Sequence, residues 1–161
     1  MDYYNPVAML NEKDDETDVD SFNASIRATL NIVPIKGLKW DNFVSFNSER
    51  YESREYQTQY YPSSVGEKGV AYISNSKASD IQYESTLQYS NVFGKHSVQG
   101  ILGYAYQQQD SRESSMENYG FDFDSFKTDN IGAGTALPQG LASMSSYRGM
   151  SHYIAFFGRV M

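Results

Sequence analysis

An aromatic and acidic segment in the second half of the chain contains the residues best suited to holding a ligand. Between residues 117 and 126, aromatic side chains alternate with glycine and aspartate. Rings offer apolar contact and carboxylates accept hydrogen bonds, a combination that can bind a sugar or a peptide. A pair of tyrosines near residue 60 is similar. The predicted ligand-binding residues are Tyr60, Tyr61, Tyr119, Phe121, Asp122 and Phe123. The alternative is a loop hairpin that packs its own aromatic side chains.

The residue types needed for catalysis or metal binding do not occur in a recognisable pattern. The two histidines, His96 and His152, fall in or beside predicted strands, where a turn or interface role is expected. Three-ligand zinc sites need more candidates than these. The serines lack a Gly-x-Ser-x-Gly motif, and Gly132-Ala133-Gly134 lacks the third glycine of a dinucleotide loop. We therefore predict no enzyme activity, no catalytic residues, no cofactor and no metal.

The acidic residues near the start of the chain are interpreted as solvated. Residues 12–20 contain six Asp and Glu side chains, and carboxylates are ligands that calcium prefers. Their spacing does not match the EF-hand loop, and no glycine stands at its sharp turn. Residues 1–20 are therefore predicted to be a loop.

The elements that position these residues are predicted to be β-strands. From Ser21 to Val33, apolar and polar side chains alternate without interruption. A period of two places successive side chains on opposite faces of a strand. Further strands are predicted near 38–60, 80–91, 96–112 and 149–161. Tight turns join the first pair and the next pair, whereas long loops cover 62–79 and 113–147.

This arrangement predicts an all-β fold, an antiparallel meander of about five long strands. Short turns on one side and long loops on the other are typical of the periplasmic and extracellular ends of a transmembrane β-barrel. A strand that crosses lipid needs about 9–11 residues. The second strand is longer, and its apolar face becomes charged after Phe46, which favours a membrane boundary. The chain is therefore interpreted as an open segment of a large transmembrane barrel.

The apolar positions of the alternating strands are predicted to face lipid. Two groups of aromatic side chains, one near each end of the apolar stretch, match the interfacial girdles of such barrels. The predicted lipid-facing residues are Phe22, Ile26, Leu30, Trp40, Val44, Phe46, Leu87, Tyr89, Leu102 and Tyr104. Alternation alone is equally compatible with a soluble β-sandwich that acts as a binding or adhesion module.

Composition narrows the class of partner. The formal net charge of −7 argues against nucleic acid, because phosphate neutralisation needs a basic surface. The chain has no cysteine, which excludes disulfides and thiolate metal sites. The first residues lack the charged and apolar regions of a signal peptide, and the last strand continues to the final residue. We therefore expect the chain to be a fragment.

Several short stretches, in order, resemble one family of outer-membrane proteins. They are Asn5-Pro6-Val7-Ala8 before the acidic segment, the strand 22–30, Gly37-Leu38-Lys39-Trp40, Phe93-Gly94-Lys95-His96-Ser97, and 146–149 followed by 156–160. Together they resemble the barrel portion of the SusC/RagA-type TonB-dependent transporters, the nutrient importers of Bacteroidetes-like bacteria. The likeness extends over nearly the whole chain.

The resemblance implies a location in the outer membrane and a plugged barrel of about 22 strands, of which this chain would supply about five. It implies a SusD-like lipoprotein partner, energy from a TonB complex, and import of an oligosaccharide or a peptide. No plug domain or TonB-contacting segment is recognised in the sequence. The expected function is part of a nutrient importer; an outer-membrane barrel enzyme would need a catalytic constellation that is not seen.

Overall fold

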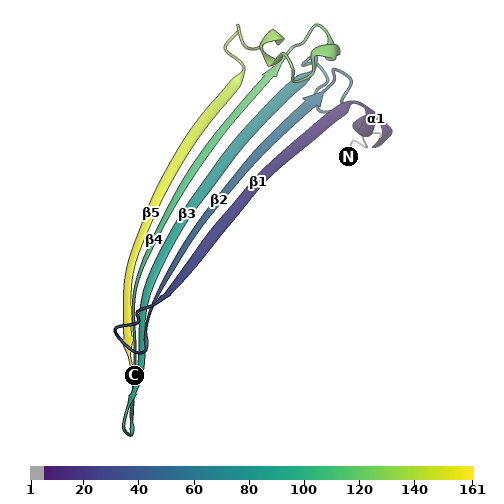
Figure 1. The fold of residues 1–161 in the computed structure, drawn as a ribbon. Coiled ribbons are helices and arrows are strands. Elements are labelled where there is room, and N and C mark those ends of the chain that lie inside the picture. The colour runs from purple at the N-terminus through teal and green to yellow at the C-terminus, as the bar shows by residue number, and fades with distance from the viewer. Residues whose placement is uncertain (1–5) are drawn as a thin grey trace. The chain divides into compact units, whose positions relative to one another are not determined.

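The computed structural model describes residues 6–161, and its five strands form one sheet. Its elements are α1 (Pro6–Asn11), β1 (Lys13–Asn31), β2 (Leu38–Gln57), β3 (Val70–Phe93), β4 (His96–Tyr119), the 3₁₀ turns η1 (Asp124–Phe126) and η2 (Ile131–Ala133), and β5 (Ser143–Val160) (Figure 1). Each strand is hydrogen-bonded to its neighbour in the sequence, in the order β1-β2-β3-β4-β5. The predicted all-β fold, a five-stranded antiparallel meander in an open sheet, is confirmed. Among residues 6–161, no helix is long and apolar enough to cross a membrane.

The strands extend further than the sequence pattern indicated. Residues 13–20 belong to β1, so the prediction of a loop over 1–20 was wrong for these residues. Likewise, β3 begins at Val70 and β4 continues to Tyr119, whereas β2 ends at Gln57. The predicted loops over 62–79 and 113–147 are therefore replaced by connections over 58–69 and 120–142. At residues 13–20 and 113–119, polar or charged side chains lie on both faces, so these strand ends show no alternation of apolar and polar residues.

The hairpin of β1 and β2 keeps one register from end to end. The amide of Ile32 donates to the carbonyl of Leu38, and the amide of Thr58 donates to the carbonyl of Glu12. The same number of residues separates these two pairs on each strand, so no net bulge intervenes. Gly37 (φ +85°) closes the turn, where a Cβ would lie 1.9 Å from the carbonyl oxygen of Ser90. Only glycine fits this close approach.

The chain divides into two compact units, which we name after the connections they contain. The loop unit comprises the residues up to Asp20, 50–77 and 112–148, and holds both long connections. The turn unit comprises 21–49, 78–111 and 149–161, and holds the tight turns. The five strands contribute residues to both units.

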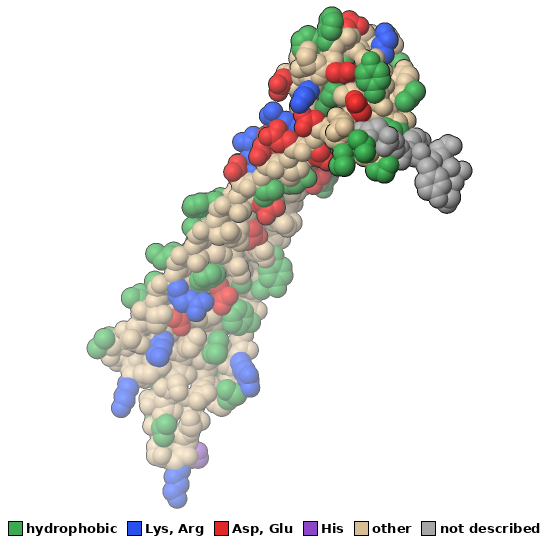
Figure 2. All heavy atoms as spheres, turned by 90° about the vertical axis from the view of Figure 1, so that its right-hand side faces the viewer, with side chains coloured by type: hydrophobic (Ala, Val, Ile, Leu, Met, Phe, Trp, Pro, Cys, Tyr) green, Lys and Arg blue, Asp and Glu red, His purple; other side chains and the backbone are tan. Residues whose placement is uncertain are grey.

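One face of the turn unit is apolar and exposed. Ring contacts place its aromatic side chains together: Phe22 lies 6.2 Å from Phe46, and Tyr104 lies 6.1 Å from Tyr83 and 5.1 Å from Phe156. Hydrophobic side chains stand out along the surface in Figure 2. The exposed members of this apolar face include Phe22, Ile26, Leu30, Trp40, Val44, Phe46, Leu87, Leu102 and Phe156. Tyr89 and Tyr104 are half-buried.

The sandwich alternative requires a second layer over this apolar face. Within residues 6–161 all five strands belong to a single sheet. Ile26 is 69% exposed, Leu30 52% and Leu102 62%. The described residues therefore do not form the two-layer core of a sandwich.

The opposite face of the turn unit is polar. Thr29 Oγ1 donates to Asp41, and Gln107 Nε2 donates to Asp80 Oδ2 at 2.7 Å. The guanidinium of Arg27 lies 5.1 Å from the centre of the Phe43 ring, a cation–π distance. The alternation predicted from the sequence thus separates two chemical environments on the two faces of one sheet.

An aromatic ring covers a glycine on this polar face. Gly103 in β4 is buried, and a Cβ at this position would lie 2.1 Å from the ring of Phe157 in β5. The missing side chain therefore makes room for the ring, which shields the backbone of the neighbouring strand.

Gly103→Ala should reduce the free energy of unfolding by about 1–3 kcal/mol, because overpacking displaces the Phe157 ring. Denaturant unfolding measures the change. Gly100→Ala in the same strand is the control, since its Cβ meets only the Arg159 carbonyl at 3.8 Å. Equal free energies of unfolding for Gly103→Ala and Gly100→Ala would show that packing of the Phe157 ring does not require glycine at position 103.

Candidate functional site

The loop unit has a small core built from three elements. Tyr56 of β2 is 2% exposed, Ala71 of β3 is fully buried and Phe121 after β4 is 4% exposed, with Ile131 packed against them. The Tyr56 and Phe121 rings meet edge to face, with their centres 5.7 Å apart. Phe121 is therefore a core residue, and its side chain is not accessible to the ligand for which it was predicted. Phe121 packs against strand residues rather than against the other aromatic side chains of its own loop.

The Tyr56 hydroxyl connects this core to the loop over 120–142. It donates to Asp124 Oδ1 at 2.8 Å, and Gln59 Nε2 lies 3.5 Å from the other oxygen of the same carboxylate. Burial and the hydrogen bond to Asp124 raise the pKa of Tyr56 well above its ordinary value. Both effects favour the neutral phenol, because the phenolate would lose solvation and face a carboxylate.

Asn118 anchors the same loop from the end of β4. This buried side chain donates through Nδ2 to the carbonyls of Ile131 at 2.6 Å and Gly134 at 3.1 Å. Its Oδ1 accepts from the amide of Tyr119 at 3.0 Å. One amide side chain thus satisfies three backbone groups that the irregular loop and the strand end would otherwise leave unpaired.

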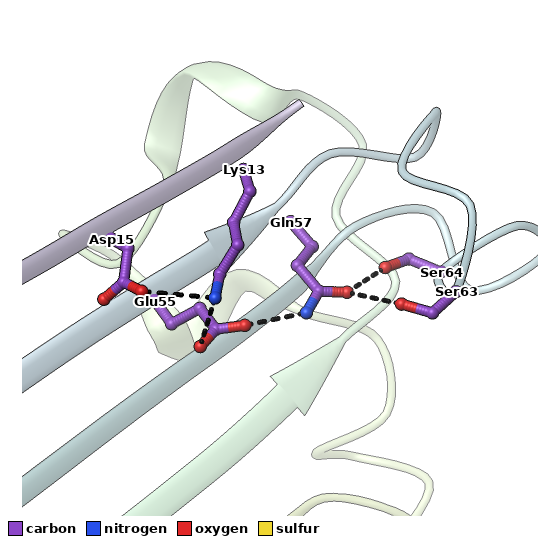
Figure 3. Close-up of polar contacts among 6 residues, drawn as sticks. All are labelled: Lys13, Asp15, Glu55, Gln57, Ser63 and Ser64. Atoms are coloured by element: carbon purple, nitrogen blue, oxygen red, sulfur yellow. Dashed lines mark hydrogen bonds and ion pairs between the residues drawn. The ribbon is translucent and has the colours of Figure 1, made fainter. Parts of the chain in front are cut away.

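Ion pairs surround this core on the strand ends. Lys13 in β1 lies 3.0 Å from Glu55 and 3.2 Å from Asp15 (Figure 3). The hydrogen bond to Glu55 is the main reason that the pKa of Lys13 is raised. Gln57 extends this contact, since its Nε2 donates to Glu55 at 2.7 Å and its Oε1 accepts from Ser63 at 3.2 Å.

A second group of ion pairs holds the loop over 120–142 to the strands. Lys127 pairs with Asp14 of β1, and Arg54 of β2 lies 3.9 Å from Asp129. Arg54 also donates to Glu52 at 2.7 Å and thereby lowers the pKa of that carboxyl. Acidic and basic side chains intermingle on this part of the surface in Figure 2. These exposed pairs each contribute little to stability, but they connect the loop to two strands.

The remaining predicted ligand-binding residues differ in accessibility. Tyr60 is 69% exposed and Phe123 is 65% exposed, and Asp122 is exposed as well. The Phe123 ring makes an edge contact with Phe126, with 6.3 Å between centres. Tyr61 and Tyr119 are half-buried. Among the described residues of the loop unit, the exposed aromatic side chains are Tyr51, Tyr60, Tyr72, Phe123, Phe126 and Tyr147. Of these, Tyr60 and Phe123 were predicted to bind a ligand.

The sequence analysis did not identify three residues that are important in this unit, namely Tyr56, Asn118 and Asp124. Tyr56 continues the alternation of β2, which was a usable signal for burial. No local pattern distinguishes Asn118 from the other polar residues of β4, because its role depends on a loop carbonyl sixteen residues away. Among residues 6–161, no group of three or more His, Cys, Asp or Glu side chains is arranged to hold a metal.

The polar face of the turn unit contains a shallow cavity of about 280 Å³. Charged side chains from three strands line it, namely Arg27, Asp41 and Glu84, together with the Phe43 and Phe157 rings. A mixture of charges and rings suits contact with water and polar groups. It makes this face chemically unlike the apolar face of the same unit.

Asn118→Ala should open the loop over 120–142, because it removes the donor to the buried Gly134 carbonyl and to the half-buried Ile131 carbonyl. A buried carbonyl left without a donor costs about 1–3 kcal/mol. Hydrogen exchange at the amides of Thr135 and Ala136, which bond to Gly120 and Tyr119, should accelerate. The control is Asn130→Ala, since the exposed Asn130 side chain makes no capping hydrogen bond. Unchanged exchange in both variants would contradict the anchoring role of Asn118.

Tyr56 should remain protonated at a pH where an ordinary tyrosine ionises. Subtracting the alkaline absorbance titration of Tyr56→Phe from that of the wild type isolates the Tyr56 hydroxyl. This hydroxyl should titrate near the ordinary tyrosine pKa of about 10 only in denaturant. The pKa of Tyr56 is raised in the folded protein. The stability that Tyr56 contributes is therefore present below about pH 10 and is lost as the pH rises further. An identical titration in folded and unfolded protein would contradict burial of the hydroxyl.

The chain is similar in sequence to a TonB-dependent receptor. It is 26% identical to TonB-dependent receptor P3 of Formosa agariphila over 161 residues, which are 99% of this chain and 15% of the relative. The chain therefore spans about one seventh of that protein. No family model matches the sequence.

Solved structures share the fold. The RagAB peptide transporter superposes with a TM-score of 0.79 at 16% identity, over 92% of this chain and 16% of the matched chain. The RagAB peptide importer in the open-open state gives a TM-score of 0.73 at 17% identity, over 91% of this chain and 16% of the matched chain. The resemblance inferred from the sequence is thus confirmed: the chain is similar in sequence to a TonB-dependent receptor, and its five-stranded sheet superposes on part of the RagAB peptide transporter.

Proposed function

We propose that this chain is part of the β-barrel of an outer-membrane, TonB-dependent nutrient importer. The similarity to a TonB-dependent receptor over 99% of the chain supports this function, and the meander of long strands agrees with the barrel architecture. The rest of the barrel and the plug would belong to other parts of the intact protein.

The main support for this proposal is the apolar face of the turn unit. On β1 its residues extend from Phe22 to Leu30, and on β2 from Leu38 to Phe46, nine residues on each strand. A strand that crosses the hydrocarbon core needs about 9–11 residues. Removing one large apolar side chain from water gains about 1.5–3 kcal/mol, so an exposed row on every strand favours contact with lipid. Of the ten residues predicted from the sequence to face lipid, eight are exposed and two, Tyr89 and Tyr104, are half-buried.

The polar face of the same unit would then line the barrel interior. Arg27, Asp41 and Glu84 would meet water or the plug there, because inward positions of large barrels are polar. The tight turns would lie on the periplasmic side. The long connections, with the exposed rings of Tyr60 and Phe123, would lie outside the cell and contribute to capture of cargo.

The partners and cargo follow the resemblance to SusC/RagA-type transporters. A SusD-like lipoprotein would act with the barrel in capturing an oligosaccharide or a peptide. A TonB complex would supply the force that rearranges the plug. In this function no covalent bond is formed or broken, so the chain contributes binding and passage rather than catalysis.

Adjacent cysteines on opposite faces test the lipid contact. This chain has no cysteine. Once any cysteine elsewhere in the intact protein has been replaced by serine, Leu87→Cys on the apolar face and Thr86→Cys on the polar face can be labelled singly with an environment-sensitive dye. In the intact protein in bilayers, a lipid-borne quencher should quench the dye at residue 87 and leave the dye at residue 86 unaffected. The dye at residue 87 should also emit at shorter wavelength, because it is surrounded by hydrocarbon.

Equal quenching at the two positions, or a water-exposed dye at residue 87, would contradict the barrel assignment. Uptake tests the transport function separately. Cells that lack the intact gene should lose import of a labelled oligosaccharide or peptide, and a protonophore should abolish import in cells that carry the gene. Import that resists the protonophore would exclude a TonB-dependent mechanism.

A further inference from the structure

An arginine lies over an aromatic ring on the polar face of the turn unit. At the turn between β1 and β2, the amide of Ile32 donates to the carbonyl of Leu38. Arg27 and Phe43 each lie five residues from this pair, so the antiparallel register places them opposite one another. The guanidinium of Arg27 lies 5.1 Å from the centre of the Phe43 ring, which agrees with this register.

A carboxylate follows on the other side of the same aromatic residue. The amide of Ser90 in β3 donates to the carbonyl of Gly37, and Glu84 and Phe43 each lie six residues from that pair. Arg27, Phe43 and Glu84 therefore form one row across β1, β2 and β3. Because neighbouring strands are about 4.8 Å apart, the backbones that carry Arg27 and Glu84 are separated by about 9.6 Å.

This row lines the cavity of about 280 Å³ on the polar face. The remaining lining residues supply a second carboxylate, a hydroxyl, an amide and two apolar groups. They are Asp41, Thr86, Gln88, Ile101 and Phe157. All of the lining residues belong to the turn unit, so the cavity is built by one unit alone.

Arg27 and Glu84 have no opposite charge within ion-pair distance among residues 6–161. Asp41 differs from them, because it accepts a hydrogen bond from the Thr29 hydroxyl. The Arg27 side chain is exposed and Glu84 is half-buried. Hydrogen bonds between ionised groups are about twice as strong as those between neutral groups. These two side chains are therefore the groups of the cavity best suited to binding a charged ligand.

The arrangement fits a ligand that has both a carboxylate and an ammonium group. A guanidinium donates to a carboxylate, and a carboxylate accepts from an ammonium. An extended chain covers about 3.3–3.6 Å per residue, so about two or three residues reach across the row. The cavity is slightly smaller than usual ligand pockets, which measure about 300–1,000 Å³. A neutral oligosaccharide would leave both charges without an opposite partner.

We propose that this cavity binds short zwitterionic peptides as they pass along the inner wall of the barrel. Arg27 binds the terminal carboxylate, Glu84 binds the terminal ammonium, and the rings of Phe43 and Phe157 contact the side chain between them. Asp41 makes the cavity unfavourable for anions that have no ammonium group. The inference rests on the proposed function, because the polar face meets cargo only if it lines the barrel interior. It narrows the cargo of that importer to peptides.

Peptide binding by the intact protein in detergent tests the cavity. An environment-sensitive dye at Gln82→Cys reports binding locally, because residue 82 lies two residues before Glu84, on the same face and outside the lining. Any other cysteine is replaced by serine. The probes are the tripeptide Ala-Phe-Ala and its two blocked forms, amidated at the carboxyl end or acetylated at the amino end. Each block should weaken binding about tenfold or more, because it removes one charge-assisted hydrogen bond.

Charge-removing variants assign each end of the peptide to one side chain. Arg27→Gln and Glu84→Gln should each weaken binding of the free tripeptide by the same factor as one block. Arg27→Gln should then bind the amidated and free forms equally, and Glu84→Gln should bind the acetylated and free forms equally. The matched controls, Arg159→Gln and Glu49→Gln, remove the same charges from the same face outside the lining. They should leave all three affinities unchanged.

Four results would overturn the inference. They are no dye response to any peptide, equal affinity of the parent protein for free and blocked peptides, equal weakening in the control variants, and an equal response to the neutral trisaccharide maltotriose. The third would indicate attraction by overall charge, and the fourth would assign the cavity to sugars. The dye test at residues 86 and 87 separates these outcomes from failure of the barrel. A lipid-facing residue 87 combined with any of the four rejects the peptide site alone.

Discussion

Every other feature of this sheet depends on its uninterrupted register. Because side chains alternate with a period of two, a slip by one residue would exchange the two faces of a strand. The hydrogen bonds at the two ends of the β1–β2 hairpin, at Ile32 and at Thr58, belong to one register. The same holds for β4 and β5, where Gln99 exchanges both backbone hydrogen bonds with Met161 and Ser115 meets Ser145. The apolar rows and the polar face of the turn unit therefore remain aligned across strands.

Turn geometry sets this register. Gly37 closes the first hairpin with φ of +85°, and its backbone approaches Ser90 so closely that a side chain could not be placed between them. The second hairpin closes through Gly94, also at positive φ. Short connections leave no freedom to shift the pairing, since loop length and turn type determine which residues face each other. Further along β4, Gly103 leaves room for the ring of Phe157 in β5.

The fold could be predicted where the two faces of a strand differ in polarity. In the turn unit, alternation identified every strand, and Ile26, Val44 and Leu102 are exposed on its apolar face. In the loop unit, both faces carry polar or charged side chains, so periodicity gave no signal for residues 13–20 or 113–119. These segments are strands because their backbone groups pair with neighbours, and pairing depends on the adjacent strand rather than on the segment's own sequence. The candidate site was harder still, since burial of Phe121 depends on Tyr56, a residue far away in the sequence.

The two units differ in polarity and in burial, so they are stabilised by different interactions. The turn unit has no buried core of its own among the described residues, and its exposed apolar side chains gain free energy only from a surrounding that excludes water. The loop unit has a small core around Tyr56 and Phe121, with Asn118 and the Tyr56–Asp124 hydrogen bond satisfying polar groups next to it. Surface pairs such as Lys13–Glu55 contribute less than about 1 kcal/mol each in water. In the proposed barrel, the apolar part of the sheet would be stabilised by lipid and the charged part by its own small core and by water.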